Sequence, residues 1–188
     1  TRTASVTGGF AALALACNLP HLARSFFMEQ NRMTPRPVSA SRAEHTQILL
    51  AEHLNGSGRL FGGRLMEWID ITAGVAARRH SGCNVTTASI DTLHFKSPAF
   101  VNDTVVLLAK VTYVGRTSME VRVDTFVEAL SGERRVINTA YLVLVALDED
   151  GKPTPVPPLI CQTDEDRMEY EAAKRRSALR KERRKEEY

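Results

Sequence analysis

The chain has 188 residues, the size of one domain with short extensions. Hydrophobic residues make up 43% of it, enough to form a core, and a formal net charge of +3 is too small to indicate any class of partner. The three cysteines are far apart and form no CxxC pair, so the sequence predicts neither a zinc site nor a disulfide framework. We interpret them as reduced thiols of a cytoplasmic protein.

Residues 1–42 are expected to be an extension or linker outside the domain. Residues 8–19 are apolar and resemble the central region of a signal peptide, but only Arg2 supplies positive charge before them. No segment reaches the roughly 18 apolar residues of a membrane span, so no membrane partner is expected. Met28 and Met33 are candidate translation starts, and residues 34–42 are rich in Pro and Ser, as linkers are.

A first strand is expected within residues 45–54, followed by a turn at 55–58 and a helix over 64–80. Apolar residues recur at helical spacing at Leu65, Met66, Ile69, Ala73 and Ala76. Ile71 and Val75 widen this face, so the helix should be largely buried. Basic residues fill its last turn, and Gly82 should end it.

After Gly82 the hydrophobic period changes from helical spacing to two. The pattern predicts strands over 85–95, 104–114, 117–130 and 134–147, joined by short connections. Consecutive strands of this kind pair antiparallel. Only one helix is available to cover the sheet, so the sequence predicts an α+β fold in which about five antiparallel strands wrap around one long central helix.

Prolines at 153–158 should end a domain that spans 43–160, and residues 161–188 are expected to form a charged C-terminal helical tail. Its apolar stripe is thin, and it ends in a basic run. We interpret it as a solvated or interface helix, with solvation favoured for its basic run.

Three features could carry chemistry. Asp70 is a carboxylate within the apolar helical stripe, where burial would raise its pKa, although an Asp on an exposed helix edge is the alternative. Gly62 and Gly63 at the helix start would leave backbone N–H groups open to an anion or oxyanion, although a simple turn also needs glycine. Asn55 could donate from its amide, although Asn-Gly is also a common turn.

Asp70 lies about 12 Å along the helix from Gly62, at 1.5 Å per residue. One helix therefore cannot bring both groups to one reacting atom. Two antiparallel helices related by a two-fold axis can, so the spacing predicts a site shared between subunits.

Short motifs in order and spacing make residues 45–160 resemble the hotdog-fold acyl-CoA thioesterases of the YciA and cytosolic acyl-CoA hydrolase type. The motifs are Asn55, Phe61-Gly62-Gly63, Trp68-Ile69-Asp70, 76–80, 86–89, Phe95 with Pro98, 114–119, and 146–148 with 155–157. The resemblance implies the hotdog fold and homodimers that share two sites, assembled as trimers of dimers into hexamers. It also implies an enzyme that needs no cofactor and no metal, with coenzyme A as part of substrate and product.

By this resemblance Asp70 is the catalytic carboxylate, acting as general base or nucleophile. Asn55 of the partner subunit positions water and the thioester, and a backbone N–H of Gly62 or Gly63 polarises the thioester carbonyl. Coenzyme A is expected to lie along Thr87, Ala88, Ser89, Arg116, Thr117, Ser118 and Arg78.

Three other functions remain open. A hotdog-fold dehydratase usually pairs a His with an acidic residue, and Asp70 has no His at a helical neighbour position. A non-catalytic module that binds acyl-CoA for regulation would not need both Asn55 and Asp70. A nucleic-acid partner is not expected, because the basic tail lacks interleaved aromatic residues.

Overall fold

The computed structural model of the chain describes residues 33–186, and residues 35–186 form one compact unit. The expectations for residues 1–32 lie outside the described residues. In chain order the elements are β1 (Arg36–Pro37), α3 (Val38–Ser41), β2 (Ala43–Ile48), the 3-10 turn η1 (Ala51–His53), α4 (Gly62–Ser81), β3 (Asn84–Phe95), β4 (Thr104–Val114), β5 (Ser118–Glu128), β6 (Arg134–Leu147), β7 (Leu159–Ile160) and α5 (Asp164–Glu186).

Five antiparallel strands form the main sheet, in the order β2-β4-β5-β6-β3. The predicted pairing of consecutive strands is confirmed for β4, β5 and β6 but is wrong for β3, which pairs with β6 at the far edge. The chain after β3 passes the start of α4, where the Leu60 N–H donates to the Ala99 carbonyl at 2.8 Å. This connection carries the chain from one edge of the curled sheet to the other.

The core lies between α4 and the inner face of the sheet, as the sequence predicts. Every second residue of the central strands points toward the helix because strand side chains alternate between faces. The buried residues that meet there are Leu65, Trp68, Ile69, Ala73, Ala76 and Ala77 of α4 with Val105, Leu107, Ala109, Val111, Met119, Val121, Val123, Ala140, Leu142, Leu144 and Ala146 of the strands. Gly82 ends α4 as predicted, in the left-handed conformation with φ 69°.

The opposite face of α4 differs from the prediction. Met66, Ile71 and Val75 are 41%, 50% and 38% exposed in the single chain, so the helix is buried on one side only. The helical spacing correctly marks these positions as apolar, but the sheet of one chain covers just the other half of the helix. An apolar face left open in this way marks a surface for another protein or ligand.

The domain begins earlier than residue 43. β1 pairs in parallel with β7, and the Arg36 N–H donates to the Pro158 carbonyl at 2.9 Å. Val38 is buried, and the Ser41 hydroxyl accepts a hydrogen bond from the Val111 N–H at 3.0 Å. Residues 35–42 are therefore part of the domain, because their extended Pro-rich backbone joins the Pro-rich segment that follows β6.

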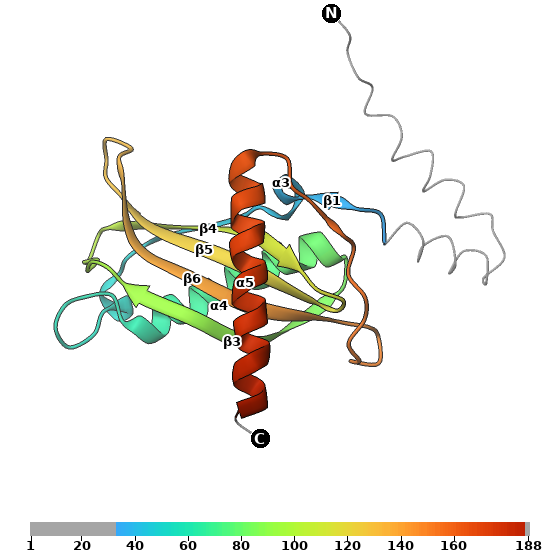
Figure 1. Ribbon diagram of the computed structural model, residues 1–188. Helices are drawn as coiled ribbons and strands as arrows, with labels where there is room; N and C mark the ends of the chain where they lie inside the picture. The colour runs from blue at the N-terminus through green and yellow to red at the C-terminus, as the bar shows by residue number, and fades with distance from the viewer. Residues whose placement is uncertain (1–32, 187–188) are drawn as a thin grey trace, which may run out of the picture. The chain divides into compact units, whose positions relative to one another are not determined.

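The C-terminal helix α5 crosses the outer face of the sheet, opposite α4 (Figure 1). Glu120 of β5 is 1% exposed and accepts hydrogen bonds from Arg176 and Arg180 of α5 at 2.8 and 2.9 Å. Arg180 also reaches Asp91 of β3 at 2.8 Å, and Arg176 lies 3.9 Å from the centre of the Tyr141 ring. The sequence predicts a solvated or interface helix here. Its inner side packs on the sheet, and a hydrophobic pattern does not reveal the ion pairs that hold it there.

Candidate active site

Asp70 lies on the exposed face of α4, and β3 returns alongside it. The Thr87 hydroxyl of β3 donates a hydrogen bond to Asp70 Oδ1 at 2.5 Å. Oδ2 of the same carboxylate has no hydrogen-bond partner among residues 33–186, and the Asp70 side chain is exposed. In the single chain Asp70 is therefore on an exposed edge of the helix, which was the alternative to a buried carboxylate. One of its oxygens is hydrogen-bonded, and the other is available to a ligand.

A cleft of about 640 Å³ opens beside Asp70, between α4 and the start of β3. Arg78 lines it, and its Nη2 donates to Asn84 Oδ1 at 2.9 Å, which fixes a guanidinium about two helical turns beyond the carboxylate. The lining residues are Asp70, Ile71, Gly74, Val75, Arg78, Asn84, Val85, Thr86, Thr87 and Leu144. This cleft combines an anionic group, a cationic group and an apolar floor.

The other end of α4 presents backbone donors. The first N–H groups of a helix have no acceptor within it, and Phe61 at the N-cap supplies no side-chain hydrogen bond. A Cβ at Gly63 would come within 2.6 Å of the Phe61 ring, and one at Gly62 would lie 3.3 Å from the Phe95 ring. Glycine at both positions therefore keeps this helix start open between two aromatic side chains.

Asn55 lies in the loop before α4 and has a defined orientation. Its Oδ1 accepts hydrogen bonds from the Ser57 N–H at 2.9 Å and the Arg59 N–H at 3.2 Å. Its Nδ2 has no acceptor among the described residues. The side chain is thus turned so that it can only donate to a ligand.

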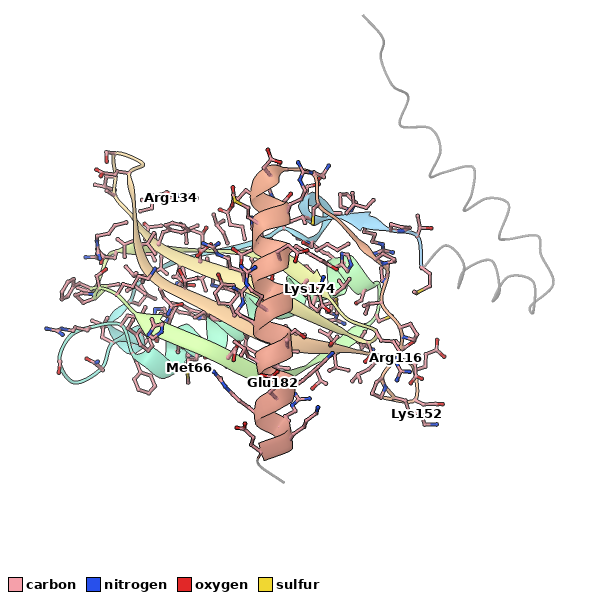
Figure 2. The ribbon with its side chains drawn as sticks, in the orientation of Figure 1. Met66, Arg116, Arg134, Lys152, Lys174 and Glu182 are labelled. Atoms are coloured by element: carbon pink, nitrogen blue, oxygen red, sulfur yellow. The ribbon has the colours of Figure 1, made fainter. Side chains whose placement is uncertain are left out.

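Asn55 and Gly62 line a second cleft of about 400 Å³, separate from that of Asp70. Its other lining residues are Arg59, Leu60, Leu65, Phe95, Lys96, Ser97, Pro98, Ala99 and Ile137. The structure thus brings Asp70, Thr87 and Arg78 together at one cleft and Asn55 with Gly62 at another. The exposed apolar face of α4 contributes Ile71 and Val75 to the Asp70 cleft and continues to Met66, labelled in Figure 2, which lines neither cleft.

The other residues predicted to contact coenzyme A line neither of the two clefts. Ala88 is exposed, and the Ser89 hydroxyl is buried without a hydrogen bond to any described residue. Arg116, Thr117 and Ser118 form the turn between β4 and β5, closed by a 2.7 Å bond from the Gly115 N–H to the Ser118 carbonyl. This turn lines neither cleft, and Figure 2 shows Arg116 near Lys152 at one end of the molecule.

Three histidines pack against other side chains or hydrogen-bond to the backbone of the domain. His45 and His53 contact the ring of Trp68, with centroid distances of 5.8 and 5.1 Å. Buried His80 donates from Nε2 to the Pro157 carbonyl at 2.9 Å, and desolvation lowers its pKa. Within residues 33–186 no group of three or more His, Cys, Asp or Glu side chains could hold a metal ion. No helix in that part of the chain is long and apolar enough to span a membrane.

Two features of the site are not evident in the sequence. Asn84 orients Arg78, and the Thr87 hydroxyl bonds to Asp70, while the expected contact of Thr87 with coenzyme A stays a prediction. Both belong to the strand that follows α4. The short connection at Gly82 indicates that this strand runs back along the helix. The hydrophobic period does not give the register, so it does not predict which strand residue lies beside Asp70 or Arg78.

Comparison with known proteins assigns a family to this arrangement. Residues 57–130 match the family model described as the thioesterase superfamily. An uncharacterised acyl-CoA thioester hydrolase of Bacillus subtilis is 42% identical over 144 residues, which are 76% of this chain and 84% of that protein. Mouse acyl-coenzyme A thioesterase 11 is 34% identical over 146 residues, which are 77% of this chain but 25% of that longer protein.

Solved structures are similar over most of the domain. An acyl-CoA hydrolase from Staphylococcus aureus in complex with butyryl coenzyme A and coenzyme A has a TM-score of 0.77 and 33% identity, covering 81% of this chain and 93% of that one. An apo hexameric acyl-CoA thioesterase has a TM-score of 0.77 and 42% identity, covering 80% of this chain and 97% of that one. The Staphylococcus enzyme is also solved as three single variants, in which alanine replaces an aspartate, an asparagine or a threonine.

Proposed function

The chain belongs to the thioesterase superfamily and has the hotdog fold, and we propose that it hydrolyses acyl-CoA thioesters to a free fatty acid and coenzyme A with Asp70 as its catalytic carboxylate. The observation that carries the proposal is the bond between Thr87 and Asp70, which holds one carboxylate oxygen and leaves the other free in an open cleft. A carboxylate arranged in this way can take a proton from water or attack a carbonyl carbon.

The variants of the Staphylococcus enzyme support this assignment. In that protein the asparagine, aspartate and threonine replaced by alanine are separated by fifteen and then seventeen residues. Asn55, Asp70 and Thr87 have the same spacing in this chain. The match favours these three side chains as parts of one site, although Asn55 and Asp70 line different clefts of a single chain.

Two subunits would complete the site. If the exposed apolar faces of two α4 helices pack antiparallel about a two-fold axis, Asp70 of one subunit meets Asn55 and the start of α4 of the other. Met66, Ile71 and Val75 would then be covered. We propose this homodimer as the active unit and, from the hexameric relative, a trimer of dimers as its assembly.

The reaction follows from the groups available. The thioester carbonyl would lie against the first N–H groups of α4 at Gly62 and Gly63, which can stabilise the oxyanion as negative charge develops. Oδ2 of Asp70 would take a proton from the attacking water, or attack the carbonyl carbon itself. The amide of Asn55 would hold the water or the substrate by donating to it. The C–S bond then breaks, and the coenzyme A thiolate leaves without a strong general acid. In the general-base route the proton on Asp70 passes to the thiolate or to water, and in the nucleophilic route water cleaves the acyl-Asp70 anhydride to release the fatty acid.

The coenzyme A end would lie beside the Asp70 cleft. Arg78, held by Asn84, is placed to meet a phosphate, and the edge strand β3 offers backbone donors at Thr87, Ala88 and Ser89. The turn of Arg116, Thr117 and Ser118 is separated from this cleft within one chain. Its proposed contact with coenzyme A therefore depends on how subunits assemble.

A dehydratase is the less favoured reaction. It would need a second proton carrier beside Asp70, and the hydrogen-bond partner of Asp70 among the described residues is the Thr87 hydroxyl, which does not titrate near neutral pH.

Thiol release tests the proposal. Purified protein is mixed with acyl-CoAs of several chain lengths, and free coenzyme A is measured beside an Asp70→Asn variant of equal stability. We expect hydrolysis by the unaltered chain and a loss of about 10² or more in kcat for the variant. Absence of thiol release by well-folded, assembled protein would instead favour a regulatory module that binds acyl-CoA without cleaving it.

A further inference from the structure

The loop before α4 contains a sequence that is chemically reactive. Asn55 is followed by Gly56, and this is the one Asn-Gly pair of the chain. Residues 55–59 are all exposed. The Gly56 N–H has no acceptor among the described residues, and nothing lies within 4 Å of the position that a Cβ would occupy. The Gly56 nitrogen, adjacent in the chain to the Asn55 side chain, therefore makes no competing hydrogen bond with the described residues.

The same loop activates the other reactant. Asn55 Oδ1 accepts from the Ser57 N–H at 2.9 Å and from the Arg59 N–H at 3.2 Å. Two donors on an amide oxygen draw electrons from Cγ and stabilise negative charge that develops on that oxygen. The arrangement is that of an oxyanion hole, built by the loop around its own asparagine.

We propose that Asn55 is a site of spontaneous deamidation. The Gly56 nitrogen loses its proton and attacks Asn55 Cγ, which forms a C–N bond and places the negative charge on Oδ1. The tetrahedral intermediate expels the side-chain nitrogen as ammonia and leaves a five-membered succinimide. Water then adds to either carbonyl of this ring and opens it to aspartate or isoaspartate. The sequence uses one water, releases one ammonia and involves no redox change.

The consequence for activity rests on the proposed function. Deamidation replaces Nδ2, the donor of Asn55, by a carboxylate oxygen that cannot donate when ionised. It also adds a negative charge that would face Asp70 of the partner subunit, where like charges repel. Each deamidated chain therefore removes one shared site, and the enzyme carries a built-in limit on its active lifetime.

Timed incubation of the full chain tests the proposal. Samples are kept at mildly alkaline and mildly acidic pH, and peptides are mapped by mass spectrometry for the replacement of NH2 by OH. We expect conversion at Asn55, faster at alkaline pH, while Asn84 and Asn138, followed by Val and Thr, stay intact. Asp150-Gly151 can also form isoaspartate, but that isomerisation leaves the mass unchanged.

The matched variant is Gly56→Ala, which adds a methyl group where the structure has open space and lies outside the proposed catalytic groups. We expect it to start with the same activity and to deamidate at least about fivefold more slowly, because alanine restricts the backbone. Equal conversion at Asn55 and Asn84, or an unchanged rate in Gly56→Ala, would overturn the proposal.

The activity readout separates the two proposals. Thiol release by the fresh protein tests the hydrolase function alone, and the mass change tests deamidation alone. Activity that falls in proportion to conversion at Asn55, and an Asn55→Asp variant that is inactive from the start, support the link between them. Conversion with undiminished activity would contradict that link.

Discussion

The Thr87 hydroxyl donates a 2.5 Å hydrogen bond to Oδ1 of Asp70, so a strand residue fixes the carboxylate of a helix residue 17 positions earlier in the chain. The bond crosses the edge between α4 and β3, the two elements that line the cleft beside Asp70. It also leaves Oδ2 as the oxygen that can act on substrate. We infer a positioning role for the Thr87 hydroxyl, and the coenzyme A contact expected of this residue stays a prediction.

Replacement of Thr87 by valine tests this positioning role. Thr87→Val keeps the shape of the side chain but removes the donor, and we expect kcat to fall about tenfold with KM nearly unchanged, the effect of losing one hydrogen bond to a charged group. Thr87→Ser, which keeps the hydroxyl, should retain most of the activity. A rise in KM with unchanged kcat would show instead that Thr87 binds substrate.

Met66→Glu probes the exposed face of α4. Met66 is 41% exposed and lines neither cleft, so a charge there should affect assembly before chemistry. We expect the variant to be monomeric in light scattering and to have lost hydrolysis, while Met66→Leu remains assembled and active. A monomeric Met66→Glu protein with full activity would contradict a shared site.

The C-terminal helix is expected to stabilise the domain through Glu120. Arg176→Ala should lower the free energy of unfolding by about 2 kcal/mol, less than the roughly 3–5 kcal/mol for a buried charge left alone, because Arg180 still pairs with Glu120. Urea denaturation measures the change. Arg184→Ala, an exposed position on the same helix, is the control and should change stability by less than about 0.5 kcal/mol. Equal losses in the two variants would contradict the role of the ion pairs.

His80 should make stability depend on pH. Desolvation of the buried imidazole lowers its pKa in the folded state, while the hydrogen bond to Pro157 opposes this effect and Arg36 adds to it. The unfolded chain therefore binds more protons below about pH 6.5, and the contribution of His80 is present above that pH and lost as pH falls toward the folded pKa.

Unfolding by urea at about pH 7.5 and about pH 5.5 should show this loss in the unaltered chain, and His80→Gln, which keeps an N–H donor but does not titrate, should reduce it. Glu169, whose lowered pKa arises from its bonds to Arg176 and Arg122 against desolvation, contributes only to losses below about pH 4.5. An equal pH dependence in both proteins would contradict the account of His80.

The sequence predicts the elements of the body well because each has a clear hydrophobic period. The bounds of α4 and β4, and the stop at Gly82, agree closely with the structure. The position of β3 beside β6 was not predicted, because hydrophobic period does not encode strand order. The packing of α5 was left open for a related reason, since its contacts centre on ion pairs around Glu120 and Ala173 is its one fully buried apolar side chain among the described residues.

The candidate site could be predicted only in part. Spacing along one helix correctly separates Asp70 from Gly62 and indicates that a single chain cannot join them. The partners of these residues depend on tertiary register, so the bond from Thr87 and the anchoring of Arg78 by Asn84 required the structure. The roles of Asn55, Gly62 and Gly63 remain predictions.

The central claim is that one site uses Asp70 of one subunit with Asn55 of the other, and mixed dimers test it most directly. Asp70→Ala and Asn55→Ala chains with different tags are co-expressed, purified through both tags in turn, and assayed for thiol release. Dimers made of one variant alone should be nearly inactive. A mixed dimer has one site in which both Asp70 and Asn55 are intact. We predict about half of the unaltered activity for each dimer that pairs one chain of each kind, since one of its two sites is restored, while dimers of like chains within the same hexamer stay inactive. Activity no higher than that of either variant alone would contradict the shared site.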